Sequence, residues 1–174
     1  MAKPAESISG ESVDRCAAWR VRRAQPRDAR EIAALGAGAF ASGWSPASIA
    51  GELARPDAET WALAATDRSG LDGFLLARRI PPERAGAARC DLEVMLIAVR
   101  ESERRRGGAS ALLATVLERS RRDGVGRVRL DVRASNAAAI GLYLRHGFAV
   151  VGRRPRYYEA REDAILMSLE LEPG

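Results

Sequence analysis

The stretch best suited to chemistry is RRRGGAS at residues 104–110, which follows an apolar run from Leu92 to Val99 and opens an amphipathic helical pattern. Gly107 and Gly108 carry no side chains, so a ligand can approach the backbone N–H groups at the helix start. A helix start carries roughly half a positive charge and several unpaired N–H donors. The stretch therefore predicts a site for the phosphates of a nucleotide-bearing cofactor. The plainer alternative is a glycine pair that merely opens a helix.

A second block, DVRASNAAAIGLY at residues 131–143, places polar groups on another predicted helix. Asn136, Ile140 and Tyr143 are four and three residues apart, so their side chains lie along one helix face. An amide at the helix start and a phenol two turns later would then face the same ligand. The alternative is structural, with Asn136 as a helix cap and Tyr143 as a core aromatic residue.

The rest of the sequence predicts the elements that must position these two blocks. Apolar runs and alternating patterns predict seven strands: Trp19 to Arg23, Thr60 to Thr66, Gly73 to Ile80, Asp91 to Val99, Arg127 to Arg133, Phe148 to Arg153 and Ala164 to Leu171. Helical spacing between capping signals predicts four helices: Pro26 to Phe40, Pro46 to Leu53, Gly108 to Gly124 and Asn136 to Arg145. The nearly continuous apolar strand at 91–99 is expected to be covered on both faces. Residues 154–163 are expected to form a loop.

Composition narrows the class of protein. The 174 residues suit a single domain at 19–174, preceded by a mixed polar segment at 1–18 that is expected to be a flexible extension. The formal net charge of +5 comes almost wholly from arginine and favours polyanionic ligands. Cys16 and Cys90 lack metal or redox spacing. No apolar run approaches the ~20 residues that span a bilayer, and a cytoplasmic protein is predicted.

Several motifs resemble those of one known superfamily. R-x-x-G-x-A, with Arg104 as its first residue, resembles the acetyl-CoA-binding signature of the GCN5-related N-acetyltransferases. L-x-V-R-x-S-N-x-x-A-I-x-L-Y-x-x-x-G-F, from Leu130 to Phe148, is similar to the pattern of the RimI-type ribosomal-protein-alanine N-acetyltransferases within it. R-x-x-Y-Y and E-D-A-x-x-M in the segment from 154 to 167 agree with that type, and Gly43-Trp44-Ser45 stands where the family has P-W-S. The match runs from about Glu93 to Leu169.

The resemblance implies an α/β fold of the GNAT type. Its mixed, mostly antiparallel central sheet has about seven strands and is flanked by about four helices. Acetyl-CoA would lie where two central strands splay apart, and no metal is implied. The residues that would contact acetyl-CoA are Ile97, Ala98, Val99, Arg104, Arg105, Arg106, Gly107, Gly108, Ala109, Ser110, Asn136 and Tyr143.

The implied reaction is direct attack of an amine on the thioester, which needs a base for the ammonium proton and an acid for the departing thiolate. Tyr143 matches the family's acid, because a phenol with a pKa near 10 is protonated at neutral pH. The family's base position, normally glutamate, holds Asp131 here. Glu93 stands where many superfamily members carry a catalytic glutamate. Both are candidates for the base, and both could instead be structural partners of nearby arginines.

The implied acceptor is the N-terminal α-amine of a protein, a small-subunit ribosomal protein that begins with alanine. The resemblance places it near Trp44, Tyr157 and Tyr158, where the family closes a loop over the incoming N-terminus. Loop packing is the alternative role for the two tyrosines. His146, the single histidine, is expected to be a solvated residue at a helix end.

Two other functions stay open. One is acetylation of a small amine such as a polyamine or an aminoglycoside, which a strongly acidic acceptor pocket would favour. The other is a basic nucleic-acid-binding module that uses the arginine clusters at 104–106, 119–122 and 153–156. Those clusters also suit coenzyme phosphates, and no aromatic-interleaved motif accompanies them. Direct nucleic-acid binding is therefore not expected.

Overall fold

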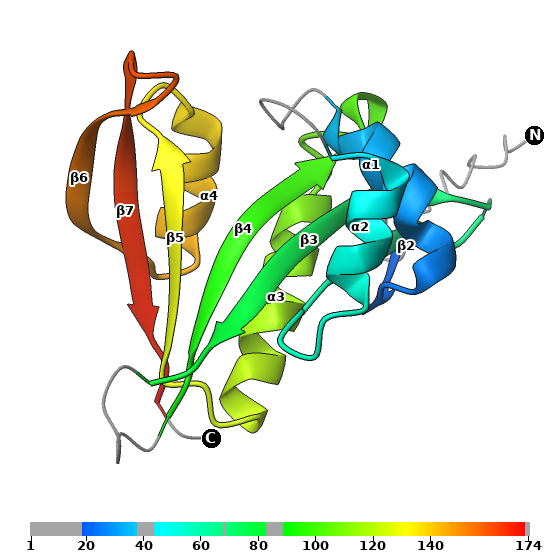
Figure 1. Ribbon diagram of the computed structural model, residues 1–174, viewed down its shortest axis with the longest axis horizontal. Helices are drawn as coiled ribbons and strands as arrows, with labels where there is room; N and C mark the ends of the chain where they lie inside the picture. Colours follow the sequence, from blue (N-terminus) through cyan, green and yellow to red (C-terminus); the bar gives the residue numbers. More distant parts are fainter. Residues whose placement is uncertain (1–18, 38–43, 68, 83–88, 173–174) are drawn as a thin grey trace, which may run out of the picture.

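A computed structural model gives the fold and describes residues 19–37, 44–67, 69–82 and 89–172 (Figure 1). Its strands are β1 (Trp19–Arg23), β2 (Trp61–Ala65), β3 (Leu71–Ile80), β4 (Asp91–Val99), β5 (Arg127–Arg133), β6 (Ala149–Tyr158) and β7 (Glu162–Glu170). Its α-helices are α1 (Ala29–Gly36), α2 (Pro46–Leu53), α3 (Gly108–Arg122) and α4 (Ala137–Arg145), and short 3-10 helices span Pro26–Asp28 and Glu101–Glu103. The predicted α/β fold is confirmed in this part of the chain.

The strands form one sheet in the order β1-β2-β3-β4-β5-β7-β6. Neighbouring strands are antiparallel except β4 and β5, which run parallel and pair only from Asp91 and Arg127 to Val94 and Leu130. Just past this point the register between β3 and β4 shifts, because Met95 is an extra residue on β4. Such a bulge bends its strand. Beyond it β4 and β5 diverge, as Figure 1 shows, so the predicted splay is confirmed.

Apolar side chains form cores on opposite faces of the sheet. On one face, Ile32 of α1 and Ile49 of α2 pack against Phe74 of β3. On the other face lies α3, whose Leu113 belongs to a core that includes residues of β4 and β5. Figure 1 shows α1 and α2 in front of the sheet and α3 and α4 behind it. Residues Leu71 to Ala77 of β3 are buried throughout, because helices cover both sides of that strand.

β4 is less covered than the sequence predicts. Leu92 and Val94 are buried, whereas Met95 is 38% exposed and the Glu93 side chain is 42% exposed. The expectation that both faces are covered is wrong here. The core under α1 and α2 includes Leu96 and Ala98, in the C-terminal half of β4. The N-terminal half of the strand, with Glu93, is open to solvent on that face.

The predicted loop at residues 154–163 is also wrong. β6 continues to Tyr158, and Glu162 already belongs to β7, so the turn is short. A register shift between Arg154 and Tyr158 accommodates Pro155, which cannot donate a ladder hydrogen bond. Asp163 replaces the missing ladder contacts by accepting from the Arg156 backbone N–H at 2.7 Å and from the Arg153 side chain.

Helix starts agree with the capping signals in the sequence. Ser45 accepts a hydrogen bond from the Ser48 backbone N–H at the start of α2, and Asn136 accepts from Ala139 at the start of α4. α1 is described as far as Gly36, so its predicted continuation to residue 40 lies outside the described residues, as does the predicted extension at 1–18. None of the described helices has both the length and the apolar character that crossing a membrane requires.

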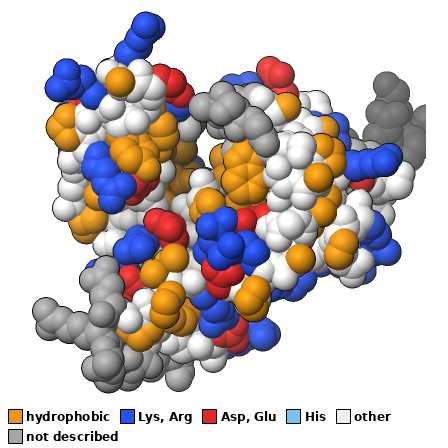
Figure 2. All heavy atoms as spheres, viewed as in Figure 1, with side chains coloured by type: hydrophobic (Ala, Val, Ile, Leu, Met, Phe, Trp, Pro, Cys, Tyr) orange, Lys and Arg blue, Asp and Glu red, His pale blue; other side chains and the backbone are white. Residues whose placement is uncertain are grey.

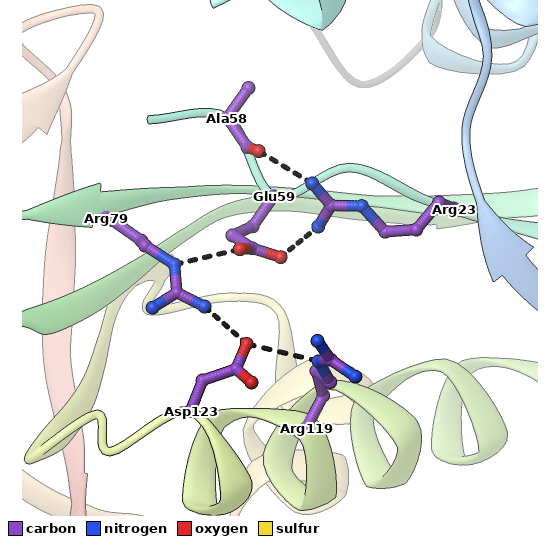
Figure 3. A network of polar contacts seen from close by, with 6 residues as sticks. All are labelled: Arg23, Ala58, Glu59, Arg79, Arg119 and Asp123. Carbon is purple, nitrogen blue, oxygen red and sulfur yellow. Dashed lines mark hydrogen bonds and ion pairs between the residues drawn. The ribbon is translucent and has the colours of Figure 1, made fainter. Parts of the chain in front are cut away.

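Figure 3 shows a chain of ion pairs that ties the first strands to the end of α3. Glu59, in the turn before β2, accepts from Arg23 of β1 and from Arg79 of β3. Arg79 also donates to Asp123 at 2.6 Å, and Asp123 accepts from Arg119 of α3. Two carboxylates thus link three guanidinium groups. Glu59 is the more enclosed carboxylate, with a side chain 13% exposed.

We expect Glu59→Gln to lower the free energy of unfolding by about 1–2 kcal/mol, because two guanidinium groups lose their shared charged acceptor. Urea denaturation measures this change. The matched control is Glu118→Gln, which removes an exposed partner of Arg122 on α3. Equal midpoints for the two variants would show that the Glu59 chain contributes no more than an ordinary surface pair.

Candidate active site

A cavity of about 730 Å³ opens between α3 and α4, beside the end of β4. We call it the helix-side cavity. It is lined by Ile97, Val99, Glu103, Arg104, Arg105, Gly107, Gly108, Ala109, Ser110, Ala137, Ala138, Ala139, Gly141, Leu142, Tyr143 and Arg145. The structure thus brings together the phosphate-type loop, the end of the central strand and the predicted phenol. These three groups come from separate parts of the chain.

The loop at the start of α3 has the geometry that its glycines predict. Gly107 is the N-cap, and its φ of 93° lies in the left-handed region that favours glycine. Gly108 is buried against β2, where a Cβ would come within 2.6 Å of the Leu63 side chain. The first helical hydrogen bond runs from Ala111 N–H to the Gly107 carbonyl. The preceding N–H groups at residues 108–110 therefore have no partner within the helix.

The arginines of this loop point in different directions. Arg104 and Arg105 line the helix-side cavity, and Arg145 reaches it from α4. Arg106 does not line it, because its guanidinium is paired with Glu103 and lies over the Trp19 ring, 5.6 Å from the centroid. The cavity therefore combines helix N–H donors with three cationic side chains, which suits a ligand with several phosphate charges.

Tyr143 lies at the inner end of the same cavity. Its side chain packs against Phe148, with ring centroids 5.6 Å apart, and the residue is 7% exposed. Burial raises the pKa of the Tyr143 phenol from its ordinary value of 10.0 to about 12, and the nearby Tyr158 phenol adds to the rise. The phenol therefore keeps its proton throughout the neutral range and can only donate one there.

Besides Arg106, two more residues of the predicted cofactor set, Asn136 and Ala98, do not line the helix-side cavity. Asn136 is exposed, and its side chain caps α4 by accepting from the Ala139 N–H at 3.1 Å. The contact that Asn136 makes is therefore that of a helix cap, which is its structural alternative from the sequence. Ala98 also stays outside the lining, and its carbonyl lies where β4 packs closely on Gly73 of β3.

Sequence reasoning missed a contact between α3 and the end of α4. His146, expected to be solvated, is partly buried, and its Nε2 lies 2.7 Å from the Ser110 hydroxyl. Burial lowers the pKa of His146, and the neighbouring Arg145 guanidinium adds to the effect. Helical spacing places His146 one turn after Leu142, but no sequence pattern reveals that α3 lies opposite.

A second cavity, of about 380 Å³, lies on the sheet face opposite α3 and α4. We call it the strand-side cavity. Its lining is mostly from β4, β5, β6 and β7 and consists of Glu93, Arg127, Arg129, Leu130, Asp131, Val151, Arg154, Leu166, Met167, Ser168 and Glu170. Figure 2 shows acidic and basic side chains side by side on this face, between the two halves of the sheet. Both candidate bases, Glu93 and Asp131, line this cavity.

The two candidate bases occupy different positions relative to the splay. Glu93 lies within the paired part of β4, with its carboxylate 3.8 Å from Arg129. Asp131 is the first residue of β5 beyond the last pair, and it accepts from Arg154 Nη1 at 2.8 Å through one oxygen. Its negative charge also raises the pKa of Tyr158, behind the larger effect of burial. Asp131 is thus the carboxylate nearer the opening.

The two tyrosines of the β6 and β7 hairpin lie beside different arginines. The Arg133 guanidinium lies 4.2 Å from the centroid of the Tyr158 ring and pairs with Glu159 in the hairpin turn and with Glu162 at the start of β7. The Arg154 guanidinium lies 5.4 Å from the centroid of the Tyr157 ring. Tyr157 packs edge-on against Tyr158 and is 53% exposed. Trp44 lies apart from both cavities and packs against the core beneath α1 and α2.

The fold and these cavities can be compared with known proteins. Residues 27–148, most of the chain, match the model of the acetyltransferase (GNAT) family. This chain belongs to that family. Its sheet, with the splayed β4 and β5, also resembles the crystal structure of ribosomal-protein-S18-alanine N-acetyltransferase from Escherichia coli. The TM-score is 0.75 at 27% identity, over 90% of this chain and 96% of that one.

Three curated relatives in this family differ in their named substrates. Mycothiol acetyltransferase of Brachybacterium faecium is 39% identical over 136 residues, 74% of this chain and 40% of that protein. Ribosomal protein bS18-alanine N-acetyltransferase of E. coli K12 is 44% identical over 78 residues, 43% of this chain and 53% of that protein. N-alpha-acetyltransferase RimI of Mycobacterium tuberculosis is 35% identical over 134 residues, 75% of this chain and 78% of that protein. The chain spans about half, or less, of the first two.

We expect the Tyr143 phenol to titrate with a midpoint near pH 12. Burial disfavours the charged phenolate, so more alkaline solution is needed to remove the proton. The chain has three tyrosines, and the difference in ultraviolet absorbance between wild type and Tyr143→Phe isolates this one. Circular dichroism at each pH confirms that the protein is folded. A difference signal centred near pH 10 would mean that the phenol is solvated.

Proposed function

We propose that this chain transfers the acetyl group of acetyl-CoA to the N-terminal α-amine of a polypeptide. The observation that carries the proposal is the helix-side cavity, which joins the N-terminus of α3 to Tyr143 at the place where β4 and β5 part. The family membership supports acetyl transfer, and a relative named N-alpha-acetyltransferase supports an α-amine acceptor.

The helix-side cavity fits acetyl-CoA by its shape and by its donors. The N–H groups at residues 108–110, with Arg104 and Arg105, would hold the pyrophosphate. The end of β4, from Ile97 to Val99, has left its partner strand β5, so its backbone can offer hydrogen bonds to the pantetheine amides. The thioester would then lie near Tyr143. Acetyl-CoA supplies an activated acyl carbon and a thiolate leaving group.

The acceptor would approach from the strand-side cavity, opposite the cofactor. Its uncharged amine nitrogen attacks the thioester carbonyl, the carbon–nitrogen bond forms, and the carbon–sulfur bond breaks. Asp131 would take the proton that the amine loses, through the carboxylate oxygen that Arg154 leaves unoccupied. Tyr143 would donate a hydrogen bond to the departing sulfur. With a pKa of about 12 the phenol stabilises the thiolate without giving up its proton.

An α-amine is an acceptor that Asp131 and Tyr143 can serve without further catalytic groups. Its ordinary pKa near 8 leaves a useful uncharged fraction at neutral pH, whereas a lysine amine near 10.4 is almost entirely protonated. Tyr157 and Tyr158 would flank the polypeptide backbone, whereas Trp44, which packs against the core beneath α1 and α2, would support the α2 end of the domain without contacting the strand-side cavity. A ribosomal protein that begins with alanine is the acceptor we favour, because the E. coli relative and structure carry that name.

A small-molecule amine is the second candidate acceptor. The observation that favours it is the mycothiol acetyltransferase relative, which aligns with 74% of this chain. The chain covers 40% of that protein, so the alignment concerns one part of it. The mixed charges of the strand-side cavity are compatible with a polar small molecule as well as with a peptide.

The deciding assay measures release of the CoA thiol from acetyl-CoA. The acceptors are an alanine-starting ribosomal peptide, its N-terminally blocked copy with a free lysine, spermidine, and the deacetylated form of mycothiol. We expect turnover only with the free peptide N-terminus, and Tyr143→Phe should lower kcat about 100-fold because the thiolate loses its donor. Preference for a small amine would contradict the peptide assignment. Absence of any turnover would contradict the enzyme assignment.

The role of Asp131 has its own test. Asp131→Asn should lower kcat about 100-fold, because an amide cannot take the amine proton. Asp131→Glu restores the family's residue and should retain most of the activity. Glu93→Gln is the matched amide control from the same cavity, and we expect a much smaller loss. A larger loss in Glu93→Gln than in Asp131→Asn would transfer the base role to Glu93.

A further inference from the structure

The strand-side cavity contains one cationic side chain whose hydrogen-bonding capacity is not met. Among its arginines, Arg127 donates to Asp91 at 2.6 Å and Arg154 donates to Asp131 at 2.8 Å. Arg129 has its carboxylate neighbour, Glu93, at 3.8 Å, too far for a hydrogen bond. The Nε atom of Arg129 is enclosed by protein and has no hydrogen-bond acceptor. The side chain as a whole is 35% exposed, and its terminal Nη groups make no hydrogen bond to a described residue, so a ligand in the cavity can reach these donors and gain a charge-assisted hydrogen bond.

The surroundings of Arg129 specify the chemistry of that ligand. A guanidinium group presents parallel N–H donors that match the two oxygens of a carboxylate. Ser168 of β7 stands directly opposite Arg129 in the register with β5 and lines the same cavity, so its hydroxyl can add a further donor. Leu166 and Val151 supply apolar walls for the methylene groups that carry the carboxylate. The arrangement suits an acidic side chain.

The position of Arg129 relative to Asp131 specifies where on the acceptor the carboxylate lies. The two residues are two apart on one face of β5, so their side chains leave the strand about 7 Å from each other. If the α-amine is at Asp131, the carboxylate lies about that far from it. In an extended chain consecutive Cα atoms are 3.8 Å apart, and the side-chain carboxylate of the second residue lies roughly 6–7 Å from the α-amine.

We infer that the strand-side cavity is a specificity site for acceptors with aspartate or glutamate as the second residue, and that Arg129 binds the carboxylate of that residue. The inference rests on the proposed α-amine acetylation and on Asp131 as the proton acceptor. Arg129 is then a residue that sets acceptor choice. It lies on the face of the sheet opposite α3, away from the helix-side cavity.

The test uses three peptides that begin Ala-Glu, Ala-Gln and Ala-Arg and are otherwise identical, with the full chain at saturating acetyl-CoA. We expect kcat/KM for Ala-Glu to exceed that for Ala-Gln about tenfold, mostly through KM, as one charge-assisted hydrogen bond predicts. Arg129→Gln should reduce this ratio to about one with the KM for acetyl-CoA unchanged. Arg129→Glu should move the preference to Ala-Arg.

Arg122→Gln is the matched control. It removes the same charge from the exposed end of α3, outside both cavities, where Arg122 pairs with Glu118. We expect this variant to retain the preference for Ala-Glu, which distinguishes a local contact from general attraction by a cationic protein. Circular dichroism and acetyl-CoA binding confirm that each variant is folded.

The outcomes separate the inference from the function on which it rests. Equal turnover of Ala-Glu and Ala-Gln by wild type, or a preference that survives in Arg129→Gln, would overturn the inference while the α-amine acetylation stands. A preference that disappears equally in Arg122→Gln would also overturn it. Turnover of none of the peptides would overturn both. Selective loss in the Arg129 variants establishes the site.

Discussion

Four consecutive residue pairs join β4 to β5, and then the two strands separate. The extra residue Met95 lies at this point and bends β4 away from its partner. Separation leaves the end of β4 with backbone groups that β5 does not pair. Such groups need a partner from elsewhere, and a bound ligand or water can supply it.

The two cavities lie on opposite faces of the sheet, beside this separation of β4 and β5. α3 and α4 cover one face and bring glycine backbone, arginines and Tyr143 to it, whereas the other face carries Asp131 and its charged neighbours. In the reaction that we propose, acetyl-CoA and the acceptor would approach from these two faces without competing for space. Direct transfer would then need no acyl-enzyme intermediate to hold the acetyl group between two binding events.

Much of the fold could be predicted from the sequence, because signals within short stretches determine most of its strands and helix ends. Strand runs such as Arg127 to Arg133, the Ser45 cap and the Gly107 start of α3 each depend on a few neighbouring residues. The end of β6 could not be predicted, because Pro155 suggests a loop, whereas the strand continues through contacts of Asp163, eight residues later, and through the pairing of Tyr158 with Glu162.

The candidate site also has features that the sequence predicts and features that only the structure reveals. The glycines and Tyr143 follow from motif spacing, and the structure brings them to one cavity. The outward turn of Arg106 depends on Trp19, nearly ninety residues earlier, and the contact of His146 with Ser110 depends on how two helices pack. The unmet Arg129 donor arises from strand register. Neither of the two contacts, nor the unmet donor, has a signal within a short stretch of sequence.

β6 is the outer strand on one side of the sheet, and its Val150 and Val151 are more than half exposed. An outer strand with apolar residues can pair with a second copy of itself and begin an aggregate. Two register shifts, a proline and the guanidinium groups of Arg153, Arg154 and Arg156 interrupt this edge. The proline and the register shifts disfavour regular pairing with a second copy of this edge, so the hairpin that carries Tyr157 and Tyr158 also limits edge-to-edge association.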